Sequence, residues 1–306
     1  MYVDEVERIR QLEVEACLAM RDGKTDSAER SWQSILIHAK IQQNKQNDEN
    51  IATVIKSLQN LLQFASRSHN DALFESWLMP TWKIIRNLPY GKELGEFVNA
   101  MAFVIADHKI ETSLLRLEII FKEYVTLAKF YHYDLELFFK EWLETAAEIT
   151  SRGADKISRK LIILLVKGIY KCSDWKILQS IMWQYYMHMQ AYAHQNGYKQ
   201  TFEAYGAVHY LEILLNEKIM AMPVGVEQKA QQRFLYSGIR DWLANIARIT
   251  GKDEGVMINE WKSCVINGAK PKLQQRFQKL FDAEMEYWHG TRPKTYAKIK
   301  DIETMF

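Results

Sequence analysis

Short runs in the sequence hold residue types that bind phosphate or metal, so their spacing decides what chemistry they could do. Gly23-Lys24-Thr25 matches the end of a phosphate-binding loop, whose glycines let the backbone surround the phosphates. The upstream glycine of such a loop is replaced by Leu18, and the run is expected to follow a helix rather than a strand. Glu286 and His289 form a single Glu-x-x-His pair, whereas a di-iron helical bundle requires two. Neither motif therefore predicts a catalytic residue, a metal ligand or a cofactor.

Two pairs of carboxylates have the residue types for acid–base chemistry, namely Glu141 with Glu144 and Glu284 with Glu286. Both pairs lie in stretches with helical periodicity, where charged side chains usually face water. A helical enzyme whose residues are scattered along the chain is one alternative. It would require a closed pocket that holds titratable groups with shifted pKa values.

The densest group of side chains suited to binding lies between residues 182 and 210, where tyrosine, methionine and histidine are mixed. Aromatic rings are favoured at binding surfaces because they give a large contact area at a low cost in conformational entropy. Two interpretations follow: a crowded core in which the hydroxyls find partners, or a groove that holds a peptide or a small ligand. The residues expected to line that groove are Tyr185, His188, Tyr192, Tyr205 and Tyr210.

Positive charge gathers in residues 152–171 and residues 262–300, although the whole chain has a formal net charge of only +2. In the second stretch, nine basic side chains outnumber three acidic ones and alternate with aromatic residues. Such a pattern can bind single-stranded nucleic acid, but a terminal helix pair with a solvated basic face has the same pattern. For this nucleic-acid alternative the candidate contacts are Lys270, Lys272, Arg276, Lys279, Arg292 and Lys294.

The elements that must position these residues are helices. From Ile51 to Ala65, apolar residues recur at spacings of three and four, which places them on one stripe of a helix. Glycine and proline number only 13 and 5 in 306 residues, so few of the turns that separate strands can form. No convincing stretch of strict alternation between apolar and polar residues is bounded by turn residues. The sequence therefore predicts an all-α fold.

Short breaks that contain glycine or proline, such as residues 88–91 and 222–225, divide the chain into about fourteen helices. Grouped in twos, the helix pairs begin about every 40 to 50 residues. A pair of that length cannot bury its apolar face alone, so neighbouring pairs must stack. Residues 140–150 and 240–250 also share the pattern Trp-Leu-x-x-x-Ala-x-Ile-Thr at an offset of 100 residues, which indicates an internal repeat.

Residues 18–36 resemble the turn region of a tetratricopeptide repeat. Gly23 stands at the turn, Ala28 at the small position where helices approach, and Trp32 at the large aromatic position. The resemblance implies a right-handed superhelical stack of antiparallel helix pairs, an α-solenoid. Later segments keep only fragments, since Phe202 stands where alanine is expected after Gly197. The pairs are also longer than that family's repeat of about 34 residues.

Residues 1–306 are therefore predicted to form a single helical-repeat domain, with residues 270–306 as C-terminal capping helices. A compact multi-helix bundle is the alternative. The predicted function is a non-enzymatic scaffold whose concave face binds a protein or a peptide, with nucleic acid as the alternative partner and a homodimer as a further possibility.

A cytoplasmic location with no membrane contact is expected. The N-terminal residues are acidic and lack the apolar stretch of a signal peptide, and the apolar runs are too short to span a bilayer. Cys17, Cys172 and Cys264 lie far apart and have neither disulfide nor metal-site spacing.

Overall fold

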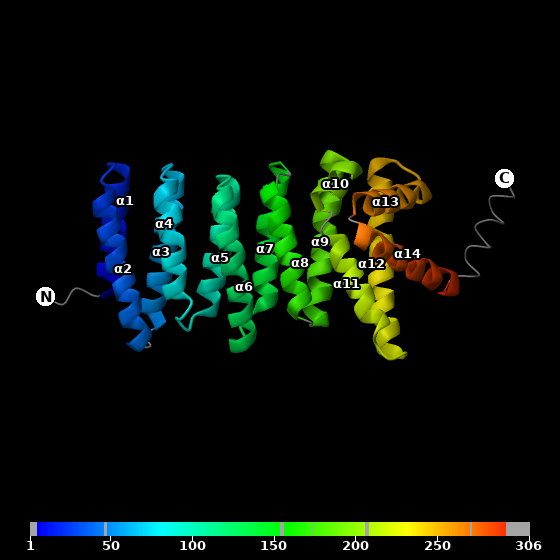
Figure 1. Cartoon of the computed structure of the whole chain (residues 1–306), viewed down its shortest axis with the longest axis horizontal. Helices are drawn as coiled ribbons and strands as arrows, with labels where there is room; N and C mark the ends of the chain where they lie inside the picture. Colours follow the sequence, from blue (N-terminus) through cyan, green and yellow to red (C-terminus); the bar gives the residue numbers. More distant parts are fainter. Residues whose placement is uncertain are drawn as a thin grey trace. The chain divides into compact units, whose positions relative to one another are not determined.

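The computed structural model describes residues 5–45, 48–153, 156–172, 174–205, 208–269 and 271–291. These residues form the α-helices labelled α1 to α14 in Figure 1 and one short 3-10 helix, and no strand occurs among them. The predicted all-α class is thus confirmed. Of the helices in the described part of the chain, none has both the length and the apolar character that crossing a lipid bilayer requires.

The chain separates into two compact units, Met1–Gly168 and Ile169–Phe306, with the boundary inside α8 (Lys156–Cys172). We call them the first unit and the second unit. A single repeat domain over the whole chain stays a prediction. Helix α14 (Pro271–Thr291) covers part of the segment expected to cap the array, while Lys270 and residues 292–306 lie outside the described residues.

The first unit consists of helices joined by short connections, together with the N-terminal part of α8. Their bounds are α1 (Glu5–Arg21), α2 (Thr25–Lys45), α3 (Asp48–Arg67), α4 (Asp71–Ile85), α5 (Gly91–Asp107), the 3-10 helix η1 (Glu111–Ser113), α6 (Leu114–Tyr131) and α7 (Leu135–Ser151).

The odd-numbered helices of the first unit form a row. Helix α1 contacts α3, α3 contacts α5, and α5 contacts α7. The even-numbered helices lie beside this row, because α2 contacts α1 and α3, α4 contacts α3, and α6 contacts α5 and α7 (Figure 1). Each helix of the row therefore has at least two neighbours, and on α3 they bury the predicted apolar stripe from Ile51 to Ala65.

The turn between α1 and α2 shows how the residues of the tetratricopeptide-like stretch are used. Gly23 has a φ of +72°, a left-handed conformation that glycine adopts without steric penalty. Ala28 and Trp32 on α2 are buried, and the ring of Trp32 stacks on that of Trp77 at a centroid distance of 5.0 Å. Trp32 Nε1 also donates a hydrogen bond to Thr81 Oγ1 at 3.1 Å. Membership of that repeat family stays a prediction.

The second unit is built around α12, which contacts α9, α11, α13 and α14. Its core is rich in aromatic rings, and the buried indoles of Trp242 and Trp261 meet edge to face at a centroid distance of 6.1 Å. The bounds of its remaining helices are α9 (Trp175–Asn196), α10 (Tyr198–Tyr205), α11 (Val208–Met220), α12 (Val226–Thr250) and α13 (Glu254–Gly268).

Candidate functional site

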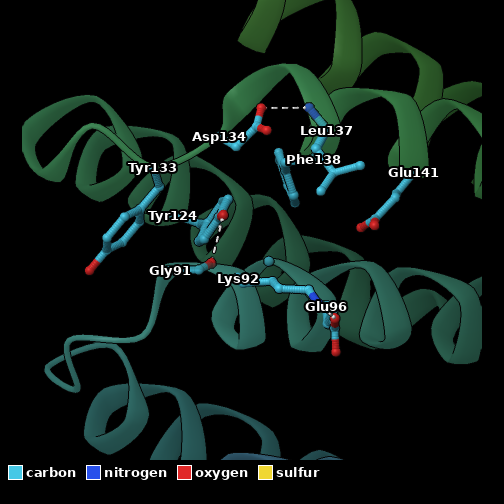
Figure 2. A pocket seen from close by; sticks show the side chains of 10 residues that line it. Gly91, Lys92, Glu96, Tyr124, Tyr133, Asp134, Leu137, Phe138 and Glu141 are labelled. Carbon is cyan, nitrogen blue, oxygen red and sulfur yellow. Dashed lines mark hydrogen bonds and ion pairs between the residues drawn. The ribbon is translucent and has the colours of Figure 1, made fainter. Parts of the chain in front are cut away.

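A pocket of about 280 Å³ opens in the first unit where α5, α6 and α7 meet (Figure 2). We call it the α5–α7 pocket. Helix α5 supplies one wall, α6 supplies a tyrosine, and the loop before α7 and the first two turns of α7 supply the rest. The lining residues are Gly91, Lys92, Gly95, Glu96, Tyr124, Tyr133, Asp134, Leu137, Phe138 and Glu141.

Two glycines on one face of α5 allow aromatic rings to approach its backbone. A Cβ atom on Gly91 would overlap the ring of Tyr133, and one on Gly95 would lie 2.7 Å from the hydroxyl of Tyr124. That hydroxyl donates a hydrogen bond to the carbonyl oxygen of Gly91 at 3.0 Å (Figure 2). Glycine at both positions is therefore what lets the wall of the pocket form.

Tyr124 and Phe138 are the two buried rings of the pocket, and they contact each other. The ring of Tyr124 lies 4.4 Å, centroid to centroid, from that of Phe138. Burial, and then its neighbours Tyr133, Glu141 and Asp134, raise the pKa of the Tyr124 hydroxyl. The phenol thus stays protonated at physiological pH and keeps its role as a donor to α5.

The start of α7 is fixed by Asp134, whose carboxylate Oδ1 accepts a hydrogen bond from the backbone nitrogen of Leu137 at 2.9 Å. This is an N-cap, and it satisfies a donor that the first turn of a helix leaves free. The cap sets the direction in which α7 leaves the loop, and so aims Phe138 and Glu141 at the pocket.

Glu141 faces the pocket from α7, and its Oε2 accepts a hydrogen bond from Asn99 Nδ2 at 3.0 Å. Burial raises the pKa of Glu141, the bond from Asn99 lowers it, and the nearby carboxylates of Glu96 and Glu144 raise it, so that the net shift is upward. Lys92 acts in the opposite direction but lies closer to Glu96, at 3.7 Å between Nζ and Oε1. Negative charge at Glu141 is therefore only partly compensated.

A row of aromatic rings continues from the pocket onto the surface. The ring of Tyr133 stacks on that of Tyr131 at 5.7 Å, and Tyr131 meets Phe130 edge to face at 4.8 Å. Phe130 and Tyr131 are 74% and 56% exposed. His132, between them and Tyr133, has a φ of +57°, and this left-handed residue ends α6 and turns the chain toward the pocket. We call Phe130, Tyr131 and Tyr133 the aromatic ledge.

The tyrosines predicted to line a groove lie in the second unit, and the structure brings three of them together. Tyr185 and Tyr205 are both 1% exposed, and the hydroxyl of Tyr185 donates to the carbonyl oxygen of Tyr205 at 3.2 Å. The ring of Tyr192 meets that of Tyr205 at 5.5 Å. Two of the three rings thus have almost no surface for a partner.

His188 and Tyr192 on α9 keep partial exposure, and the side chain of Tyr210 lies outside the described residues. The arrangement is that of a packed helix interface, the first of the two interpretations offered by the sequence. A binding role for these five residues stays a prediction.

A buried polar network joins α9, α11 and α13 in the same unit. His209 Nδ1 lies 2.8 Å from Glu212 Oε2, and the hydroxyl of Tyr186 donates to Glu212 Oε1 at 3.2 Å. Trp261 Nε1 lies 3.3 Å from His209 Nε2 and can only donate, so Nε2 accepts and the histidine proton sits on Nδ1. Burial and Glu212 raise the pKa of Tyr186. Each polar atom of this network is satisfied within the core, which favours a structural role.

A second hollow, of about 500 Å³, lies on the second unit between α9 and α12. The exposed Trp183 stands at its rim, and Gly238 allows α12 to approach the ring of Tyr186, which is 3.2 Å from where a Cβ would be. We call it the α9–α12 hollow. Its lining residues are Trp183, Tyr186, Ala230, Arg233, Phe234, Ser237, Gly238 and Asp241.

Of the basic residues predicted to contact nucleic acid, Arg276 forms two hydrogen bonds of 2.6 Å to the carboxylate of Glu217, and Lys279 is exposed. The side chain of Lys272 and the whole of Lys270, Arg292 and Lys294 lie outside the described residues.

The other basic stretch is also partly engaged in ion pairs. Arg152 pairs with Asp107 at 2.5 Å and with Glu148, and Lys160 pairs with Glu118 at 2.6 Å. These cations are held by local carboxylates, which lowers the positive field that the stretch presents to a polyanion.

The sequence did not reveal the α5–α7 pocket, although it contains two signals of it. Gly95 lies inside a helical stretch, where glycine is unfavourable unless a close approach requires it, and Gly91 stands four residues earlier, at the end of the break at residues 88–91. Glu141 was expected to be a solvated carboxylate. Among the described residues no group of three or more His, Cys, Asp or Glu is placed to hold a metal ion. Comparison of the chain with protein-family models, curated proteins and solved structures finds no match.

Proposed function

We propose that this chain is a helical scaffold that binds a segment of another protein, and that the α5–α7 pocket and the aromatic ledge form its binding surface. The observation that carries the proposal is the exposure of Phe130 and Tyr131 beside a preformed pocket. Aromatic rings that adjoin a pocket are typical of the centre of a protein interface, whereas a lone exposed ring has no such meaning. Covering the two rings would contribute on the order of 2 to 4 kcal/mol to binding.

The proposal includes the arrangement of the helices. We infer a stack of antiparallel helix pairs in the first unit, which is supported by the row of contacts from α1 through α3 and α5 to α7. Neighbouring helices of that row, α5 and α7, are the ones that flank the pocket. A stack of this kind presents an extended surface to an extended or helical segment, and it binds without any catalytic group. Right-handed superhelical winding and a cytoplasmic location belong to the same proposal.

Nucleic acid is the alternative partner, and it has less support. Arg152, Lys160 and Arg276 each form ion pairs with carboxylates, so a nucleic acid would have to displace those partners. The α5–α7 pocket itself is lined by more carboxylates than cations, which disfavours a phosphate backbone there.

A peptide-display selection on the immobilised full chain tests the proposal. We expect enriched peptides to bind the double variant Phe130→Ser, Tyr131→Ser at least about tenfold more weakly than the wild type, a loss of about 1.4 kcal/mol. Leu115→Ser is the matched control. Leu115 is another exposed apolar side chain of the first unit, but it lies outside the proposed surface. Enriched peptides that bind the double variant as tightly as the wild type, or a selection that enriches nothing, would contradict the proposal.

A further inference from the structure

The lining of the α5–α7 pocket is rich in groups that attract a cation. Glu96, Asp134 and Glu141 carry carboxylates, and Lys92 is the one cation of the lining. The Lys92 side chain is 71% exposed and lies 3.7 Å from Glu96, so water screens it and its charge is directed at one carboxylate only. An anionic side chain from a partner would be repelled here, and a neutral one would leave the negative charge uncompensated.

Hydrogen-bond acceptors are also in excess beside Glu141. The carboxylate receives a hydrogen bond from Asn99 Nδ2, while the Oδ1 atom of the same buried amide has no hydrogen-bond partner. A buried acceptor without a donor is unfavourable, because it has lost its hydrogen bond to water and gained none in return. An ammonium has three donors and a guanidinium has five, and neither has an acceptor, so both match the carboxylates of the lining, whereas Asn99 itself lies behind Glu141 and outside the lining.

Aromatic rings also line the pocket. Tyr124, Tyr133 and Phe138 all line the pocket, and the faces of such rings attract a cation that lies within about 6 Å of their centres. Figure 2 shows the rings of Tyr124 and Phe138 between Glu141 on one side and Tyr133 on the other. Rings and carboxylates together are the chemistry by which proteins hold ammonium and guanidinium groups.

The volume of the pocket limits the size of the chemical group that it can hold. Its volume of about 280 Å³ is below the range of roughly 300 to 1,000 Å³ that is usual for pockets that enclose a whole small ligand. One long side chain suits it better. The methylene stem of that side chain would lie along Leu137, which is partly exposed at the mouth, and the flanking residues of the partner would reach the aromatic ledge.

We infer that the α5–α7 pocket receives the ammonium or guanidinium group of a lysine or arginine side chain on the partner protein. The inference rests on the proposed function, because it names the chemistry of the segment that the scaffold binds. Glu141, held from behind by Asn99, forms the polar end of the site, and the partly exposed ring of Tyr133 is the aromatic face open to a partner. Tyr124 and Phe138, each 2% exposed, close the pocket as buried rings, and Phe130 and Tyr131 of the aromatic ledge form the adjoining apolar surface.

The test uses the peptides selected on the full wild-type chain. We expect them to share a lysine or an arginine, and replacement of that residue by norleucine to weaken binding at least about fivefold. Glu141→Gln, which keeps the shape of the side chain and removes its charge, is expected to weaken binding to the same extent. Glu111→Gln changes the net charge equally outside the pocket lining and should leave binding within about twofold.

The possible failures are distinct. Selected peptides that bind through the aromatic ledge but carry no basic residue, and that bind Glu141→Gln as well as the wild type, would overturn the inference and leave the scaffold function in place. A selection that enriches no peptide at all would overturn the scaffold function and this inference with it.

Discussion

Glu141 and Asp241 occupy the same position in two copies of one sequence pattern, 100 residues apart, and each lines the hollow of its own unit. Each precedes a buried tryptophan, Trp142 on α7 and Trp242 on α12. The match extends to the preceding residues. Residues 134, 137 and 138 line the α5–α7 pocket, and the residues 100 positions later, 234, 237 and 238, line the α9–α12 hollow. In both copies of the sequence pattern, on α7 and on α12, the same positions of the helix line a hollow.

The two acids differ in their surroundings, and this difference gives the first prediction. Asp241 shares its hollow with Arg233, one cation for one carboxylate, whereas the α5–α7 pocket has three carboxylates for one cation. Glu141→Gln should therefore weaken binding of a basic peptide at least about fivefold, and Asp241→Asn should change it less than about twofold. Fluorescence anisotropy with one labelled peptide measures both. Equal losses in the two variants would show that the charge balance of the linings does not decide the binding.

The second prediction concerns the approach of Tyr124 to α5. In Gly95→Ala the new methyl group would lie 2.7 Å from the Tyr124 hydroxyl, so the ring must move and its bond to the Gly91 carbonyl is lost. Alanine stabilises a helix by about 1 kcal/mol relative to glycine, but overpacking and the lost hydrogen bond together destabilise the fold by more than this. We expect a net loss of about 1 to 2 kcal/mol in the free energy of unfolding, measured by urea denaturation.

A double-mutant cycle supplies the control for that prediction. In the Tyr124→Phe background the clashing oxygen is absent and the nearest ring atom lies 3.3 Å from the new methyl group, so Gly95→Ala should cause a much smaller loss there or none. An equal loss in both backgrounds would mean that the hydroxyl contact is not what excludes a side chain at position 95.

Helix periodicity and short breaks were sufficient to predict the all-α class, because both are local properties of the chain. The break at residues 88–91, for example, separates α4 from α5, and Gly197 separates α9 from α10. The pocket could not be predicted in the same way, since Gly91 and Tyr124 meet only through the packing of α5 on α6. The predicted groove shows the same limit, because the composition around Tyr185 and Tyr205 does not reveal that both rings are buried.

The third prediction concerns the buried network of the second unit. Glu212→Ala would leave the Tyr186 hydroxyl and the Nδ1 proton of His209 without their acceptor and would open a cavity. Each unsatisfied buried donor is unfavourable by about 1 to 3 kcal/mol, so we expect a loss of about 3 kcal/mol or more in the free energy of unfolding.

Glu217→Ala is the matched control for Glu212→Ala. It removes a carboxylate from the same helix, but one that pairs with Arg276 at the surface, where an ion pair contributes less than about 1 kcal/mol. Similar losses in the two variants, measured by thermal unfolding, would show that Glu212 is not the centre of a satisfied network.

The fourth prediction follows from the upward shift of the Glu141 pKa, which is caused by burial and by Glu96 and Glu144. Between the ordinary pKa of a glutamate and this raised value, the folded chain binds more protons than the unfolded chain. The wild type therefore loses stability as pH rises through that interval, and Glu141→Gln does not. Relative to the wild type, the variant should gain a few tenths of a kcal/mol as pH rises through that interval, a small gain because solvent screens this partly exposed group.

The affinity for a basic ligand should depend on pH in the opposite direction to the stability of the free chain. A cation in the pocket stabilises the ionised form of Glu141, so the affinity for a basic peptide should fall as pH is lowered through the raised pKa. Lys92 on α5 opposes that shift, and Glu96 and Glu144 support it, so Glu96→Gln should displace the midpoint of the fall to lower pH. A titration of peptide affinity against pH in the wild type, Glu96→Gln and Glu141→Gln measures this midpoint. Affinity that is independent of pH in the wild type, or that falls equally in Glu141→Gln, would assign the titration to another group.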